Sequence, residues 1–267
     1  MKIKIYIVTY RNTEDLTANL NSLFGSDWLG HDIEICIINN HSSFQLEQHL
    51  LDKIKVLHNV CRPDFSTGHL SRNWNQAIIH GFKNLKSPDC DLLVSCQDDT
   101  IFDSNWCRDL LKLHETYSFV QKGVGDNLCS YLPEAVINIG LWDERFCGIG
   151  YQEADYFLRA KIHNGPGSTI NDWAHGRFHN RTEEEIAKRA QPIMLPNGTV
   201  NHSIFHKESM KHHAVSRNVF MKKWGINPEQ WQNHIGAFPT KSLIENYILY
   251  PYFELDIVDL QSKNYLI

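Results

Sequence analysis

The first hundred residues alternate between short apolar runs suited to β-strands and longer runs with apolar side chains at helical spacing. The strand-like runs cover residues 3–9, 33–38, 55–57 and 92–96, and the helix-like runs cover residues 12–25 and 72–82. This alternation predicts a doubly wound, mostly parallel sheet flanked by helices. Residues 92–96 are apolar on both sides of the chain, which favours a central strand. The predicted class is therefore α/β.

Residues with capping chemistry mark the expected helix ends. Asn12 and Gly25 would bound the first helix, and Ser104 would begin a helix over residues 104–114. The second half is less regular. We expect helices there over residues 153–164 and, from a capping box at its start, over residues 182–189.

Composition narrows the class of protein. With 267 residues, of which 42% are hydrophobic, the chain can bury a sizeable core in one large domain, with or without an appendage. A net charge of −5 without a basic block argues against a nucleic-acid partner. The seven cysteines form no C-x-x-C pair and favour free thiols in a reducing compartment. Since no signal peptide or membrane-spanning run is apparent, we expect a cytoplasmic protein without a transmembrane segment.

Ligands of doubly wound sheets bind outside the carboxyl ends of the strands. That rule selects three short segments, Thr9-Tyr10-Arg11, Asn39-Asn40 and Gln97-Asp98-Asp99. Adjacent carboxylates at the end of a buried strand repel each other, and a cation would relieve the repulsion. Hard oxygen ligands suit Mg²⁺ or Mn²⁺, which can bridge to a diphosphate. The alternative is a pair of aspartates that only cap a loop.

Four segments in order along the chain carry a family resemblance: Ile7-Val8-Thr9-Tyr10-Arg11-Asn12, Ile37-Ile38-Asn39-Asn40-His41-Ser42, Gly68-His69-Leu70-Ser71-Arg72-Asn73 and Leu93-Val94-Ser95-Cys96-Gln97-Asp98-Asp99-Thr100. Together they resemble the family 2-like glycosyltransferases of the GT-A fold, which use nucleotide sugars and a D-x-D metal motif. The resemblance extends from residue 1 to about 225. It implies a GT-A domain over 1–225, with a nucleotide-binding half at 1–103 and an acceptor-binding half at 104–225, followed by a helical C-terminal extension at 226–267.

The resemblance also implies roles for individual residues. The donor's base and ribose would bind at the first two segments, through Thr9, Tyr10, Arg11 and Asn39. Arg72 would lie near the diphosphate or the sugar. Asp98 would face the donor, and Asp99 would ligate Mn²⁺ or Mg²⁺ directly. Two residues depart from the family pattern: Asn39 stands where the family usually has Asp, and Gln97 stands at the first acid of the metal motif.

A later segment, Gly148-Ile149-Gly150-Tyr151-Gln152-Glu153-Ala154-Asp155, resembles the family's G-x-G-x-E-D-x-D run. Gln152 replaces the family's leading Glu, and Glu153 stands at the Asp that serves as catalytic base. Glu153 is therefore the expected base and Asp155 the second choice. Because positions i and i+2 of a helix do not share a face, the two side chains should point apart. The alternative is an ordinary acidic first turn.

Histidines could complete the metal site. His206, in an H-x-x-S segment upstream of Lys223-Trp224-Gly225, resembles the family's third metal ligand, with His202 and His179 as the next choices. Without a cysteine pair or an H-E-x-x-H motif, a structural zinc site is not expected.

The expected function is transfer of a sugar from a nucleotide sugar, with inversion and a divalent metal. UDP-sugars are favoured as donors and GDP-sugars are possible, and the acceptor hydroxyl would belong to a glycan, a lipid-linked sugar or a protein. Two alternatives remain open. One is an inactive nucleotide-sugar-binding module, since Gln97 and Gln152 replace family acids. The other is a sugar nucleotidyltransferase, although the first turn lacks a Gly-rich phosphate loop.

Overall fold

The computed structural model describes residues 1–10, 12–42, 44–59, 70–122, 126–146, 150–163, 193–194, 200–201 and 213–224. Several predictions fall outside these residues: the donor contact of Arg11, the helix over 182–189, the metal ligands His206, His202 and His179, and the extension over 226–267. Among the described residues, no helix has the length and apolar character needed to cross a membrane.

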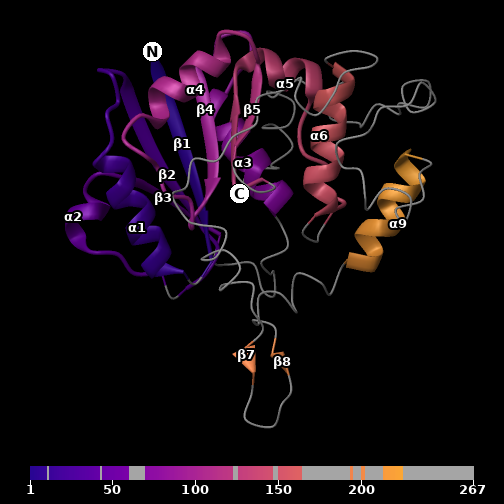
Figure 1. Cartoon of the computed structure of the whole chain (residues 1–267), viewed down its shortest axis with the longest axis horizontal. Coiled ribbons are helices and arrows are strands. Elements are labelled where there is room, and N and C mark those ends of the chain that lie inside the picture. The colour runs from indigo at the N-terminus through magenta and orange to yellow at the C-terminus, as the bar shows by residue number, and fades with distance from the viewer. Residues whose placement is uncertain are drawn as a thin grey trace.

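A six-stranded sheet forms the centre of the molecule (Figure 1). Its strands are β1 (Lys2–Thr9), β2 (Asp32–Asn39), β3 (Lys55–His58), β4 (Leu92–Gln97), β5 (Phe119–Lys122) and β6 (Leu128–Tyr131), in the order β3-β2-β1-β4-β6-β5. The first four run parallel, whereas β6 pairs antiparallel with both β4 and β5. The α/β class and the mostly parallel sheet are confirmed, with β4 at an interior position.

Helices and short strands complete the described structure. The helices are α1 (Thr13–Phe24), α2 (Gln48–Leu51), α3 (Leu70–Phe82), α4 (Trp106–His114), α5 (Pro133–Ile139), α6 (Tyr151–His163) and α9 (His213–Trp224). A separate antiparallel pair consists of β7 (Ile193–Met194) and β8 (Val200–Asn201). The predicted order of strands and helices through β4 is confirmed, except that the short helix α2 was not predicted.

The sheet has a hydrophobic core on each face, as its alternating side chains require. On one face, Ile5 of β1 packs with Leu20 of α1 and Trp106 of α4. On the other, Tyr6 packs with Trp74 of α3 in a cluster that continues to the aromatic side chains of α6. Burying a large apolar side chain contributes roughly 1.5–3 kcal/mol, so each cluster fixes its helices against the sheet.

One predicted helix start is confirmed and one is wrong: α1 begins directly after Asn12, its N-cap residue, whereas α4 does not begin at Ser104. The side chain of Asn12 makes no capping hydrogen bond; it is held by two carboxylates instead, at 2.7 Å from Asp15 Oδ2 and 3.3 Å from Asp98 Oδ1. The helix predicted from Ser104 begins at Trp106, because Asn105 occupies the N-cap position. The predicted C-cap at Gly25 is confirmed.

Candidate functional site

The carboxyl ends of β1, β2 and β4 bring three of the predicted site residues to one edge of the sheet. The register pairs Thr9 with Asn39 and Val8 with Gln97. The backbone N–H of Asp98 then donates to the carbonyl of Val8 at 3.1 Å. Segments separated by about 30 and 90 positions in the sequence therefore meet at one place, as the strand-end rule requires.

Asp98 is held by donors from the first strand and the turn after it. The hydroxyl of Thr9 donates to Oδ2 at 2.7 Å, and the amide of Asn12 donates to Oδ1 at 3.3 Å. Burial raises the pKa of Asp98 to about 7, and the negative charges of Asp99 and Asp15 add to that rise, although the Thr9 and Asn12 hydrogen bonds oppose it. An acid with this pKa is ionised at neutral pH only in part, and a neighbouring cation would favour its charged form.

Asp99 lies beside Asp98 and is half-buried, with Oδ1 accepting a hydrogen bond from the Asn127 amide at 3.0 Å. The two carboxylates and the carbonyl groups at this edge are the hard oxygen ligands that Mn²⁺ and Mg²⁺ prefer. A cation bound here would stabilise the ionised form of Asp98, which burial and neighbouring acids disfavour. Within the described part of the chain, no group of three or more His, Cys, Asp or Glu side chains could hold a metal. The residues present fit a divalent cation that also takes ligands from its substrate.

The second predicted donor contact, Asn39, is buried and engaged on both ends of its amide. Its Oδ1 accepts the backbone N–H of His41 at 3.0 Å, and its Nδ2 lies 3.0 Å from Nδ1 of His58. The ring of Tyr10 meets His41 edge-on, with centroids 5.3 Å apart. The amide that replaces the family's Asp can therefore donate to His58, which a carboxylate could not do. His58 lies at the end of β3, and its contact with Asn39 was not predicted because a lone histidine carries no sequence signal.

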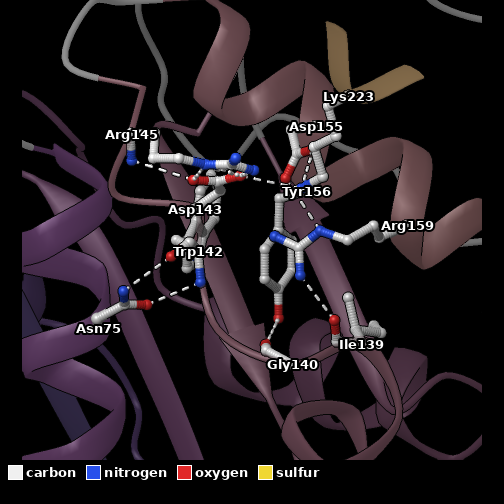
Figure 2. Close-up of polar contacts among 10 residues, drawn as sticks. All are labelled: Asn75, Ile139, Gly140, Trp142, Asp143, Arg145, Asp155, Tyr156, Arg159 and Lys223. Carbon is white, nitrogen blue, oxygen red and sulfur yellow. Dashed lines mark hydrogen bonds and ion pairs between the residues drawn. The ribbon is translucent and has the colours of Figure 1, made fainter. Parts of the chain in front are cut away.

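Arg72 lies in the first turns of α3, and its Nε donates to Glu144 Oε2 at 3.1 Å. The other oxygen of Glu144 accepts from the Asn75 amide at 2.9 Å. Asn75 in turn clamps the backbone of Trp142, donating to its carbonyl at 2.9 Å and accepting its N–H at 2.8 Å (Figure 2). The structure thus ties Arg72 to the segment before α6. Its predicted contact with a diphosphate or sugar stays a prediction.

Glu153 lies in the first turn of α6, and its Oε2 accepts the backbone N–H of Asp126 at 3.1 Å. Burial raises the pKa of Glu153 to about 8, and the negative charge of Asp126 adds to the rise. A carboxyl group with a pKa near the working pH can exchange a proton with a substrate hydroxyl, as a general base must. The role of Glu153 as catalytic base stays a prediction.

Asp126 is the residue that the sequence did not reveal. It is only 2% exposed and accepts hydrogen bonds from three side chains, Gln97 at 2.8 Å, Trp74 at 2.7 Å and Gln152 at 3.5 Å. It precedes β6, whose pairing with β4 brings it to the site: Gln97 donates its backbone N–H to the carbonyl of Asn127 at 2.9 Å. The one usable signal was an acid that follows a glycine-rich turn between two short β-prone runs.

Asp155 lies in a buried cluster of charges (Figure 2). Arg159 lies one turn further along α6, and its Nε donates to Asp155 Oδ2 at 3.0 Å. Lys223 of α9 lies 2.6 Å from Asp155 Oδ1 and 3.1 Å from Asp143 Oδ2. Because the Asp155 side chain is fully buried and ion-paired, the function proposed below rests on Glu153 alone.

No family model matches the chain, and neither does any curated protein. Among solved structures it is similar to TarS from S. aureus, with a TM-score of 0.43 and 14% identity over 60% of this chain and 34% of TarS, so the match spans about a third of that protein. For the TarS fragment 1–349 the TM-score is 0.46 at 14% identity, over 87% of this chain and 78% of the fragment.

A further similar structure is a mannosyltransferase from Pyrobaculum calidifontis in complex with GDP-Man and Mn²⁺. Its TM-score is 0.43 at 11% identity, over 91% of this chain and 78% of that one. At these TM-scores a likeness assigns no activity, so the geometry of the site is what supports a function.

Proposed function

We propose that this chain is a GT-A glycosyltransferase that moves a sugar from a nucleotide sugar to an acceptor hydroxyl with inversion. One observation carries the proposal: two acids with raised pKa values lie a short hydrogen-bonded path apart. Asp98 follows Gln97, Gln97 donates to Asp126, and the Asp126 backbone donates to Glu153. The acid proposed to face the donor and the acid proposed to accept the proton are thus linked through Gln97 and Asp126.

The donor would bind along the carboxyl ends of β1 and β2, which belong to the nucleotide-binding half proposed for residues 1–103. Thr9, Tyr10, Arg11 and Asn39 would contact the base and ribose, and Arg72 the diphosphate or sugar. Asp99 would hold Mn²⁺ or Mg²⁺, with His206 as the proposed further ligand; when bound, the ion neutralises charge on the departing nucleoside diphosphate. UDP-sugars are the favoured donors and GDP-sugars the second choice.

Glu153 would take the proton of the acceptor hydroxyl as the hydroxyl oxygen attacks the anomeric carbon. The bond from that carbon to the diphosphate oxygen breaks as the new glycosidic bond forms, so attack from the opposite face inverts the centre. Glu153 must be ionised to accept the proton. Because its pKa is raised to about 8, we expect the transfer rate to increase as the pH rises through about 8.

Donor binding and turnover test the proposal together. UDP-GlcNAc and GDP-mannose, with and without Mn²⁺, are screened by thermal shift, and any donor that binds is then assayed for hydrolysis and for transfer to simple glycosides. We expect one donor to raise the Tm in a Mn²⁺-dependent way and to be slowly hydrolysed.

Asp99→Asn should remove the Mn²⁺-dependent part of that shift. Asp109→Asn, an exposed acid on α4, is the matched control and should leave the shift unchanged. Binding without hydrolysis or transfer would favour the inactive nucleotide-sugar-binding module, and absence of any Mn²⁺-dependent binding would contradict the proposal altogether.

A further inference from the structure

The backbone N–H of Asp126, just before β6, donates to the carboxyl group of Glu153 in the first turn of α6 at 3.1 Å, and the negative charge of Asp126 acts on Glu153. No ion pair to either acid occurs among the described residues. The buried contacts of Asp126 come instead from uncharged donors on three separate elements: Trp74 on α3, Gln97 at the end of β4 and Gln152 on α6. Such convergence on one carboxylate is specific, because each donor must be placed by a different part of the fold.

The hydrogen bonds decide which member of the pair is ionised. An indole N–H can only donate, so Asp126 Oδ2 must accept from Trp74 at 2.7 Å. The amide nitrogen of Gln97 likewise requires Oδ1 to accept at 2.8 Å. A proton on either oxygen of Asp126 would compete with one of these bonds. Glu153 receives a single backbone donor, so the negative charge belongs on Asp126 and the proton on Glu153.

We propose that Asp126 is a positioning residue for Glu153, fixing that carboxyl through its backbone amide and keeping the pair's single proton on Glu153 rather than on itself. This inference rests on the proposed function, in which Glu153 is the base. When Glu153 loses its proton to solvent, its carboxylate becomes able to accept the proton of an acceptor hydroxyl. Asp126 thereby sets the pH at which the base is available.

The electrostatics agree with this geometry. Burial raises the pKa of Glu153 to about 8, with the charge of Asp126 as the next cause. Burial raises the pKa of Asp126 as well, and its three side-chain donors oppose that rise. The other titratable group of the described residues that interacts with both acids is the Cys129 thiol on β6, whose pKa burial raises so far that it stays neutral. The buried charged groups that join α6 and α9 form ion pairs of their own, in which Asp155 contacts both Arg159 and Lys223.

Asp126→Asn tests the inference, because it removes the charge and keeps the backbone N–H. Infrared spectra of the full-length chain over a pH titration follow the carboxylic C=O band of Glu153, which Glu153→Gln identifies by its loss. We expect the midpoint of that band to fall by about one pH unit or more in Asp126→Asn. The acid limb of the transfer–pH profile should fall equally, with the donor KM unchanged. Asp109→Asn is the matched control and should shift neither.

A second variant, Trp74→Phe, keeps both charges and removes one donor from Asp126, so the midpoint of Glu153 should also fall, by less. This variant replaces Asp126→Asn as the test if Asp126→Asn does not fold, which would be seen as loss of the near-ultraviolet circular dichroism signal. An unchanged midpoint in a folded variant overturns the inference, whatever the activity. A wild-type chain that transfers no sugar overturns the proposed function and the positioning role, while the infrared midpoint still decides which acid holds the proton.

Discussion

Helix α6 carries two acids, two residues apart, in opposite electrostatic surroundings. Glu153 feels the negative charge of Asp126, and burial together with that charge raises the pKa of Glu153 to about 8. Asp155 faces Arg159 and Lys223 and shares Lys223 with Asp143. Burial acts to raise the pKa of Asp143, but its bonds to Arg145 and the charge of Lys223 outweigh burial and hold the pKa below its ordinary value.

The difference separates an acid available for chemistry from acids that hold the structure together. Removing a cation that is paired with a buried carboxylate destabilises the folded chain. A buried carboxyl group beside another acid keeps its proton to higher pH and can exchange it near neutrality. Sequence spacing predicted that the two side chains point apart. In the structure they lie in different surroundings, Glu153 near another acid and Asp155 among cations.

The largest expected effect contrasts the two acids directly. Glu153→Gln should lower the transfer rate by roughly 10²–10⁴-fold, because the amide cannot take the acceptor's proton. Asp155→Asn should lower the Tm and leave the rate per folded molecule within about threefold, since its carboxylate is engaged in ion pairs with Arg159 and Lys223. The rates are measured at saturating donor, with the folded fraction taken from circular dichroism. The reverse pattern would make Asp155 the base.

The next effect concerns the cation that joins α6 and α9. Lys223→Met removes a charge that contacts both Asp155 and Asp143 and leaves two buried carboxylates with fewer partners (Figure 2). Removing one member of a buried ion pair costs about 3–5 kcal/mol, and Arg145 and Arg159 should keep the loss near 3 kcal/mol. Urea unfolding measures it. Lys222→Met, an exposed neighbour on α9, should change stability by less than about 0.5 kcal/mol.

A smaller effect comes from a buried titratable group with neutral partners. His114 contacts the carbonyl of Tyr117 and the hydroxyl of Ser130, each at 2.8 Å, and burial lowers its pKa to about 4. Below about pH 6.5, His114 is therefore protonated in the unfolded chain but stays neutral in the folded chain. Burying His114 therefore does not reduce the free energy of unfolding above about pH 6.5, and reduces it progressively as the pH falls toward 4.

The loss should reach about 2–3 kcal/mol near pH 4. Because all acids titrate in this range, the informative measurement is the difference in unfolding free energy between the wild type and His114→Asn at pH 7 and pH 4.5. That difference should shrink at the lower pH. A difference independent of pH would show that His114 does not titrate as its burial requires.

Local patterns predicted the parts of the fold that are themselves local. Strands β1, β2 and β4 and helix α3 are long or strongly apolar, and the four-residue β3 was predicted from its apolar centre. The strand-end rule placed Thr9, Asn39 and Asp98 at one edge. The four-residue strands β5 and β6 were missed, because runs that short give little periodicity.

The site residues that were missed depend on non-local contacts. Asp126 gains its role from Trp74 and Gln97, which lie 52 and 29 positions earlier in the chain. The family resemblance identified Gln97 and Gln152 as departures, yet only the packing of α3, β4 and α6 shows that both amides donate to one carboxylate. The spacing of residues along a sequence carries no information about such convergence.

The pairing of Lys223 with Asp143 spans 80 positions and has a consequence for the order of assembly. While the chain is being synthesised, the sheet through β4 can complete its pairing before α9 exists, because its contacts are all nearer the N-terminus. Asp143 and Asp155 must stay hydrated, or rely on their arginines, until Lys223 emerges. We therefore expect the half that carries Glu153 to reach its final packing last. The proposed catalytic base would then be positioned after the edge of the sheet where the donor is proposed to bind.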